Sequence, residues 1–199
     1  MFDFNLYSAL LIPAVIQGSI YSALLWKRSK SHDNKSDWFL ALLCLYGVFH
    51  IAQWMLGFAG WYDARNEYSL FMFYFPFKNW FIIGPLLFYF VKTRTNSNYI
   101  FNKKDWLHFL PGLLFYAYAL FCFLYDVVFL KWIKGVELAE FNGMRGFFAQ
   151  QNFGILDTPL TIAAFGLLIF YIVRSIMYYN SYKSHIKNEH SNAEEVSLK

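Results

Sequence analysis

Five long apolar segments divide this sequence, and they constrain the fold more than any other feature does. They cover residues 6–26, 38–61, 70–91, 107–130 and 159–179. Each is long enough to cross a bilayer as a helix, because ~20 residues span ~30 Å of hydrocarbon. None shows the two-residue alternation of a β-barrel strand, and an isolated span must satisfy its own backbone. The sequence therefore predicts an all-α, polytopic membrane helix bundle with five transmembrane helices.

The composition agrees with a membrane location. Charged residues make up only 15% of the chain, whereas a soluble domain usually carries about 25%. The net charge of +4 is also compatible with nucleic-acid binding. The Lys and Arg residues, however, lie mostly in short loops between apolar segments, which favours a role in membrane topology. We therefore expect no nucleic acid to bind through this chain.

The basic loops predict the orientation of the helices. The loops 27–37 and 92–106 carry four Lys or Arg residues each, whereas the loop 62–69 carries only Arg65. This alternation predicts that the N-terminus is outside and the C-terminus is cytoplasmic. We accordingly divide the chain into a five-helix transmembrane domain, residues 1–180, and a polar cytoplasmic tail, residues 181–199.

The third segment, LFMFYFPFKNWFIIGPLLFYFV, interrupts its apolar run with a polar pair, Lys78 and Asn79, and with the step Gly84-Pro85. Polar groups inside a bilayer are costly and usually face the interior of a bundle. A Gly-Pro step usually bends a helix and leaves carbonyl groups for neighbouring helices to satisfy. We therefore expect this segment at the centre of the bundle.

Six polar side chains are predicted to lie within the bilayer, most of them in its outer half. They are Gln17, His50, Gln53, Lys78, Asn79 and Asp126. One interpretation is an outward-facing pocket for a small molecule or a lipid headgroup, in which Lys78 holds an anionic group. The alternative is structural: Lys78 pairs with Asp126 or extends to the interface, and the amides join helices at ~1 kcal/mol or less each. The sequence leaves both interpretations open.

The outer loop 131–158 mixes aromatic residues with glycines, which is typical of a short helix lying at the membrane interface. Such a helix is either an amphipathic connector or a lid over an outward-facing pocket.

Motifs for catalysis are missing from the sequence. It has no HExxH, GxSxG, CxxC or P-loop pattern. Cys44 and Cys122 lie inside apolar segments and are expected to be small buried residues. We therefore predict no enzymatic activity, no cofactor and no metal site.

Several stretches are similar to a known family. GPLLFYFVKTRTNSNYIFNKKDWLHFLP, residues 84–111, resembles the membrane sensor half of bacterial transcription regulators that have seven membrane helices followed by an AraC-type helix-turn-helix domain. WFLALLCLYGVFHIAQWMLGFAGWYD, residues 38–63, and the tail HSNAEEVSLK are similar to the same family. The resemblance implies a sensing or regulatory role in the bacterial cytoplasmic (inner) membrane. The two further helices and the DNA-binding domain of that family are not in this sequence, so DNA binding is not implied for any residue here.

We thus expect a non-enzymatic membrane sensor or regulatory module, either a truncated regulator or a free-standing one. The alternative is a small transporter or a protein that binds a lipid or small molecule. Expected partners are membrane lipid, a small-molecule or lipid ligand, and either further copies of the chain or the missing C-terminal helices.

Overall fold

The computed structural model describes residues 5–64, 67–74, 79–96, 98–137 and 146–197, and the regular elements in these ranges are all helical. In chain order they are α1 (Leu6–His32), α2 (Lys35–Phe58), η1 (Trp61–Ala64), α3 (Glu67–Tyr74), α4 (Trp80–Thr95), η2 (Lys103–Phe109), α5 (Leu110–Phe123), η3 (Leu124–Ile133), α6 (Phe147–Asn152) and α7 (Asp157–Ser197).

Four stretches of helix in the described residues are long and apolar enough to cross a membrane. They are Leu6–His32, Lys35–Phe58, Lys103–Ile133 and Asp157–Ile186. These helices correspond to the first, second, fourth and fifth predicted segments, so the all-helical fold class is confirmed. Many of their large apolar side chains, such as Ile20 and Ile169, are exposed on the surface of the bundle. Side chains of this kind are expected on a surface that faces lipid.

The third predicted segment, residues 70–91, differs from the single helix that the sequence predicted. Its described part contains the end of α3, most of α4 and the N-cap residue Asn79 before α4, and residues 75–78 lie outside the described residues. The sequence predicted a bend at Gly84-Pro85. The helix does not end there: α4 continues through both residues to Thr95. Gly84 instead allows a close approach of α7: a side-chain carbon at this position would lie 2.7 Å from Cδ2 of Tyr171.

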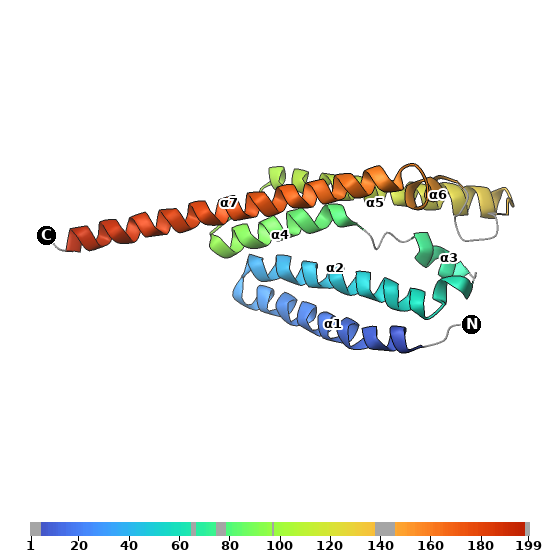
Figure 1. The fold of residues 1–199 in the computed structure, drawn as a ribbon, viewed down its shortest axis with the longest axis horizontal. Helices are drawn as coiled ribbons and strands as arrows, with labels where there is room; N and C mark the ends of the chain where they lie inside the picture. Colours follow the sequence, from blue (N-terminus) through green and yellow to red (C-terminus); the bar gives the residue numbers. More distant parts are fainter. Residues whose placement is uncertain (1–4, 65–66, 75–78, 97, 138–145, 198–199) are drawn as a thin grey trace.

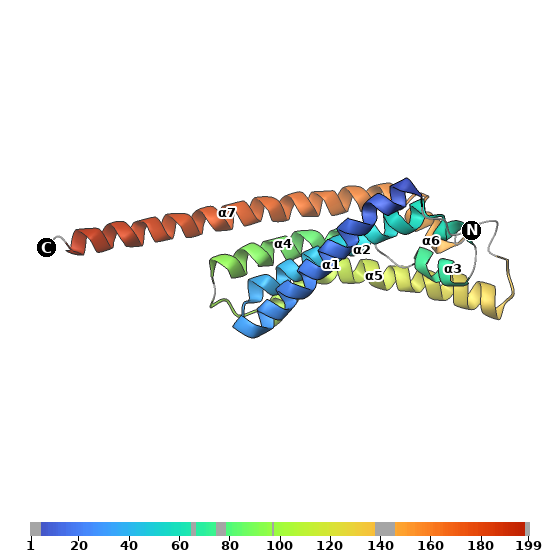
Figure 2. The same cartoon turned by 90° about the horizontal axis from the view of Figure 1, so that it is seen from below.

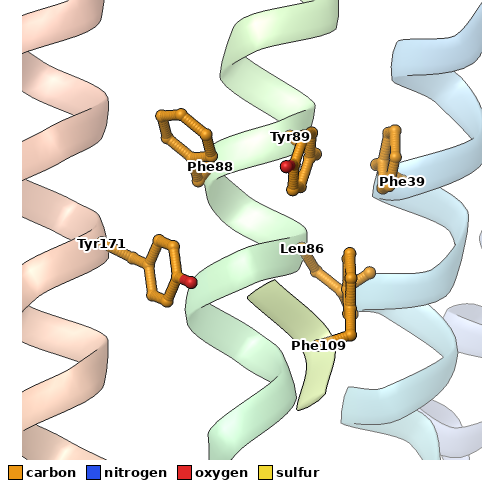
Figure 3. Close-up of a cluster of buried hydrophobic side chains, with 6 residues drawn as sticks. All are labelled: Phe39, Leu86, Phe88, Tyr89, Phe109 and Tyr171. Carbon is orange, nitrogen blue, oxygen red and sulfur yellow. The ribbon is translucent and has the colours of Figure 1, made fainter. Parts of the chain in front are cut away.

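Helix α4 lies at the centre of the bundle, as the sequence predicted. It packs against α2 on one side and against α7 on the other, while α1 packs on the far side of α2 (Figure 1). Figure 3 shows Phe39 of α2 and Tyr171 of α7 on opposite sides of α4, next to Tyr89 and Phe88. These side chains belong to the buried aromatic cluster that joins the three helices. In lipid, such packing stabilises a bundle through van der Waals contact rather than through the hydrophobic effect.

The bundle has two distinct ends (Figures 1 and 2). We call one the basic end, because the turn 33–34 and residues 98–102 lie there among the cations Lys27, Arg28, Lys30, Lys35, Lys92, Arg94, Lys103 and Lys104. We call the other the α6 end, where the start of α1 and the short elements η1, α3 and α6 lie. At ~1.5 Å per residue, the 41 residues of α7 measure about 62 Å. Helix α7 therefore extends well beyond the bundle at the basic end.

A carboxylate organises the polypeptide at the basic end. Asp105 accepts hydrogen bonds from the hydroxyl of Tyr89 at 2.8 Å, from the hydroxyl of Tyr99, and from the backbone N–H of Asn102 at 2.7 Å. The ammonium of Lys92 lies 4.0 Å from the centre of the Tyr99 ring. Burial, and then the hydrogen bond to Asp105, raise the pKa of Tyr99. These contacts connect the end of α4 to the start of η2.

Candidate functional site

A cavity of about 390 Å³ lies at the α6 end of the bundle. Its walls come from α2, η1, α3, α5 and α6, so segments distant in the sequence meet around it. Most of the wall is aromatic. Phe148 of α6 packs against two residues of α3, with ring centres 4.2 Å from Tyr74 and 5.2 Å from Phe73. A cavity of this kind suits a ligand with an apolar or aromatic body.

Three amide side chains, Gln53, Gln151 and Asn152, line this aromatic cavity. The Oε1 atom of Gln53 is buried and accepts no hydrogen bond within the described part of the chain. Gln151 is 3% exposed, and its Oε1 lies 3.5 Å from the thiol of Cys122. An unsatisfied carbonyl oxygen inside a protein is costly. Gln53 is therefore the group in this cavity best suited to accept a hydrogen bond from a ligand.

Tyr62 of η1 supplies a hydroxyl at the cavity wall. Burial raises the pKa of Tyr62 to about 12, so this hydroxyl is neutral at physiological pH. The described residues that line the cavity include no charged side chain. The cavity wall is therefore neutral over these residues, which favours an uncharged ligand.

Asp126 fixes the position of α6. This fully buried carboxylate accepts hydrogen bonds from the backbone N–H groups of Phe148 at 3.0 Å and Phe147 at 3.3 Å, and from the hydroxyl of Tyr74 at 3.3 Å. It thereby satisfies two of the N–H groups that the first turn of a helix leaves without partners. The neighbouring Gly146 has a φ of 93°, and a side-chain carbon there would lie 2.2 Å from Oδ1 of Asp126. Helix α6 is thus held in place as one wall of the cavity.

A second cavity, of about 310 Å³, adjoins the first. Trp54, Phe115, Gln151 and Asn152 line both cavities, and the first turns of α7 complete the wall of the second. His50 also lines this second cavity, where its Nε2 accepts a hydrogen bond from the indole N–H of Trp54 at 3.3 Å. The two cavities therefore connect α6 with the beginning of α7 through shared side chains.

The structure brings together only some of the residues that the sequence singled out. Gln53 and His50 line the two neighbouring cavities. Asn79 is buried between helices, where its side-chain N–H donates to the carbonyl oxygen of Gly112 at 2.9 Å. Gln17 is exposed on α1 and lines neither cavity. Lys78 lies outside the described residues, so its predicted role as an anion-binding group stays a prediction.

Two cavity residues, Gln151 and Asn152, were missed by the sequence reasoning. The signal for them was the run Gln150-Gln151-Asn152, which directly follows Phe147 and Phe148. Three amides next to aromatic residues suggest a helix that buries some of its polar side chains. Helix α6 lines the cavity, and the choice between a lid and an amphipathic connector stays a prediction.

The site as a whole has room for a small molecule. Among the described residues, no three His, Cys, Asp or Glu side chains are placed to hold a metal ion. Comparison of the chain with known protein families, with curated proteins and with solved structures found no match.

Proposed function

We propose that this chain is a membrane sensor module that binds a small, uncharged molecule in the cavity at the α6 end. The observation that carries the proposal is that shared side chains connect this cavity to the start of α7. The cavity shares Gln151 and Asn152 with the second cavity, and that cavity is lined by the start of α7. Helix α7 then passes the aromatic cluster through Tyr171 and extends beyond the basic end. On this proposal, α7 links the binding site to the opposite side of the membrane.

The proposed orientation places the basic end in the cytoplasm and the cavity on the outer side, because Lys and Arg are enriched in cytoplasmic loops. In this arrangement the region of α3 and α4 supplies the fifth crossing. The resemblance to the sensor half of AraC-type membrane regulators supports a bacterial cytoplasmic membrane and a regulatory output. On this proposal, ligand binding at the outer side changes the position of α7 at the inner side.

The ligand class follows from the cavity wall. Aromatic side chains enclose most of the space, and the Oε1 atom of Gln53 needs a hydrogen-bond donor. A small molecule with a hydrophobic body and one N–H or O–H group meets both requirements. Phenol is a suitable probe, and toluene is its control, because it has nearly the same shape but no donor.

A thermal-melt experiment in mild detergent tests the binding proposal. Phenol should raise the melting temperature more than toluene does at equal concentration, since a ligand that binds only the folded state stabilises it. One hydrogen bond contributes ~1 kcal/mol, which corresponds to about fivefold in affinity. Gln53→Leu should remove the preference for phenol. Gln17→Leu is the matched control, because the same change on the exposed face of α1 should leave the preference intact.

A distance measurement with phenol tests the proposed change in the position of α7. Spin labels at Ser31→Cys and Tyr182→Cys, in a Cys44→Ala, Cys122→Ser background, report the distance between α1 and α7 at the basic end. Phenol should change this distance in the protein with the wild-type cavity. It should leave the distance unchanged in the Gln53→Leu variant. Equal effects of phenol and toluene on the melt would refute the binding site. Phenol binding with an unchanged distance would refute the sensing role alone.

A further inference from the structure

A third, larger hollow lies at the basic end and is separate from the two cavities described above. It is a groove of about 690 Å³ between the end of α1, α2, α4, η2 and α5. Phe49, Trp106 and Leu113 line it and are themselves exposed, so the groove is open along its side. Helices α1 and α2, which border it, are of membrane-spanning length, so in the membrane topology proposed above its open side faces the bilayer.

The polarity of the groove changes along its length. Its mouth at the basic end carries Lys30, Asp33 and Lys35. The rest of its lining is aliphatic or aromatic, with Leu42 of α2, Leu86 of α4 and Leu113 of α5 among the wall residues, apart from Ser29 and Thr93 near the mouth. A phospholipid has the same distribution of polarity, with a charged headgroup at one end followed by a long apolar chain.

The length of the groove fits one leaflet. Its lining on α2 runs from Lys35 to Phe49, a separation of 14 residues, or about 21 Å at ~1.5 Å per residue. One leaflet with its headgroup layer measures roughly 20 Å, about half of the ~40–45 Å thickness of the bilayer. A lipid whose headgroup lies at the mouth of the groove could therefore place its acyl chain in the groove along the whole depth of the leaflet.

The charge at the mouth favours an anionic headgroup. The two ammonium groups of Lys30 and Lys35 outnumber the single carboxylate of Asp33. Lys35 uses one N–H to donate to the carbonyl oxygen of Tyr99 at 3.0 Å, and an ammonium group has three donors. The nearby carboxylate of Asp37 does not reduce this surplus, because it pairs with Arg28 at 2.6 Å.

We infer that this groove is a binding site for one anionic phospholipid from the leaflet at the basic end. The phosphate lies at Lys30 and Lys35, and one acyl chain lies against Leu42, Leu86 and Leu113. The bound lipid would fill the space between the α1–α2 pair and α5 and stabilise their relative position. This inference does not depend on the ligand proposed for the α6 end.

Native mass spectrometry of the purified chain tests the inference, with phosphatidylglycerol and phosphatidylcholine of identical acyl chains as probes. The wild-type chain should retain one phosphatidylglycerol per copy in preference to phosphatidylcholine. Lys30→Gln with Lys35→Gln should lower phosphatidylglycerol retention by about tenfold or more, because each lysine near a membrane surface contributes substantially to the attraction of anionic lipid. Retention of phosphatidylcholine should change little.

Two further variants separate this site from general surface charge. Lys103→Gln with Lys104→Gln removes the same charge from the same end, but neither residue lines the groove. This control should retain phosphatidylglycerol as the wild type does. Leu42→Trp, which narrows the groove, should lower retention of both lipids, and a thermal melt establishes that it folds. The inference would be overturned if the control pair lost as much phosphatidylglycerol as the groove pair, or if the wild type retained the two lipids equally. A wild-type chain that forms a dimer without bound lipid would also overturn it.

Discussion

Asp126 illustrates how a buried charge inside an apolar segment can have a structural role. The sequence offered two interpretations for it, a ligand contact or a partner for Lys78. Its partners among the described residues are the first N–H groups of α6 and the hydroxyl of Tyr74. Lys78 lies outside the described residues, so its pairing with Asp126 stays a prediction. Hydrogen bonds to an ionised group are stronger than neutral ones. This carboxylate therefore joins η3, α6 and α3 at the edge of the cavity.

Replacement of Asp126 tests this role. Asp126→Leu should lower stability by about 2 kcal/mol, because it removes a helix cap and leaves buried donors without an acceptor. Asp126→Asn retains an acceptor and should cost less. Thermal melts in detergent measure both. The double variant Lys78→Met with Asp126→Leu should be no more stable than Asp126→Leu alone; a restored melting temperature would show that Lys78 and Asp126 are paired.

The sequence predicted some individual site residues but not others, for a physical reason. Counting ~1.5 Å per residue estimates the height of a side chain along a helix. It does not give the direction in which the side chain points, which depends on how the helices pack. Gln53 and Gln17 were therefore equally plausible pocket residues, although the first lines the cavity and the second is exposed.

Short elements complete the cavity that the longer helices α2 and α5 begin. The long helices could be predicted from apolar length alone, since a span must satisfy its own backbone. Helix α6 has only six residues, so its position depends on contacts with distant residues such as Asp126 and Tyr74. A short interfacial helix in this loop was predicted. Its packing over the cavity required the structure, because those distant contacts leave no periodic pattern in the sequence.

Two glycines with positive φ provide a matched test of how α6 is held. Gly146 has a φ of 93°, and a side-chain carbon there would meet Asp126. Gly135 has a φ of 65°, and a side-chain carbon there would meet nothing within 4 Å. Gly135→Ala should cost about 1 kcal/mol from backbone strain alone. Gly146→Ala should cost at least 1 kcal/mol more and should also abolish the phenol-dependent shift of the melt. Equal losses of stability for the two variants would mean that Asp126 does not fix this turn.

At the scale of the whole molecule, the basic residues of two separate loops lie at one end of the bundle. The sequence predicted the loops 27–37 and 92–106 on the same side of the membrane, and the structure places the corresponding ends of α1, α2 and α4 together (Figures 1 and 2). Residues 31 and 98 lie at this end, with α2, α3 and α4 between them in the chain. If both residues lie on the same side of the membrane, the chain between them crosses it an even number of times. Helix α2 makes one crossing, so the region of α3 and α4 must make the other.

Cysteine labelling tests this five-span topology and its orientation. In a Cys44→Ala, Cys122→Ser background, single cysteines replace the exposed residues Ser31 and Asn98 at the basic end, and Gln150 and Ile155 at the α6 end. In intact bacterial cells, a membrane-impermeant maleimide should label positions 150 and 155, and it should label positions 31 and 98 only after permeabilisation. This outcome is expected because loops rich in Lys and Arg remain in the cytoplasm. Labelling of the basic end in intact cells would reverse the orientation. Labelling of only one of positions 31 and 98 would show that the α3–α4 region does not cross.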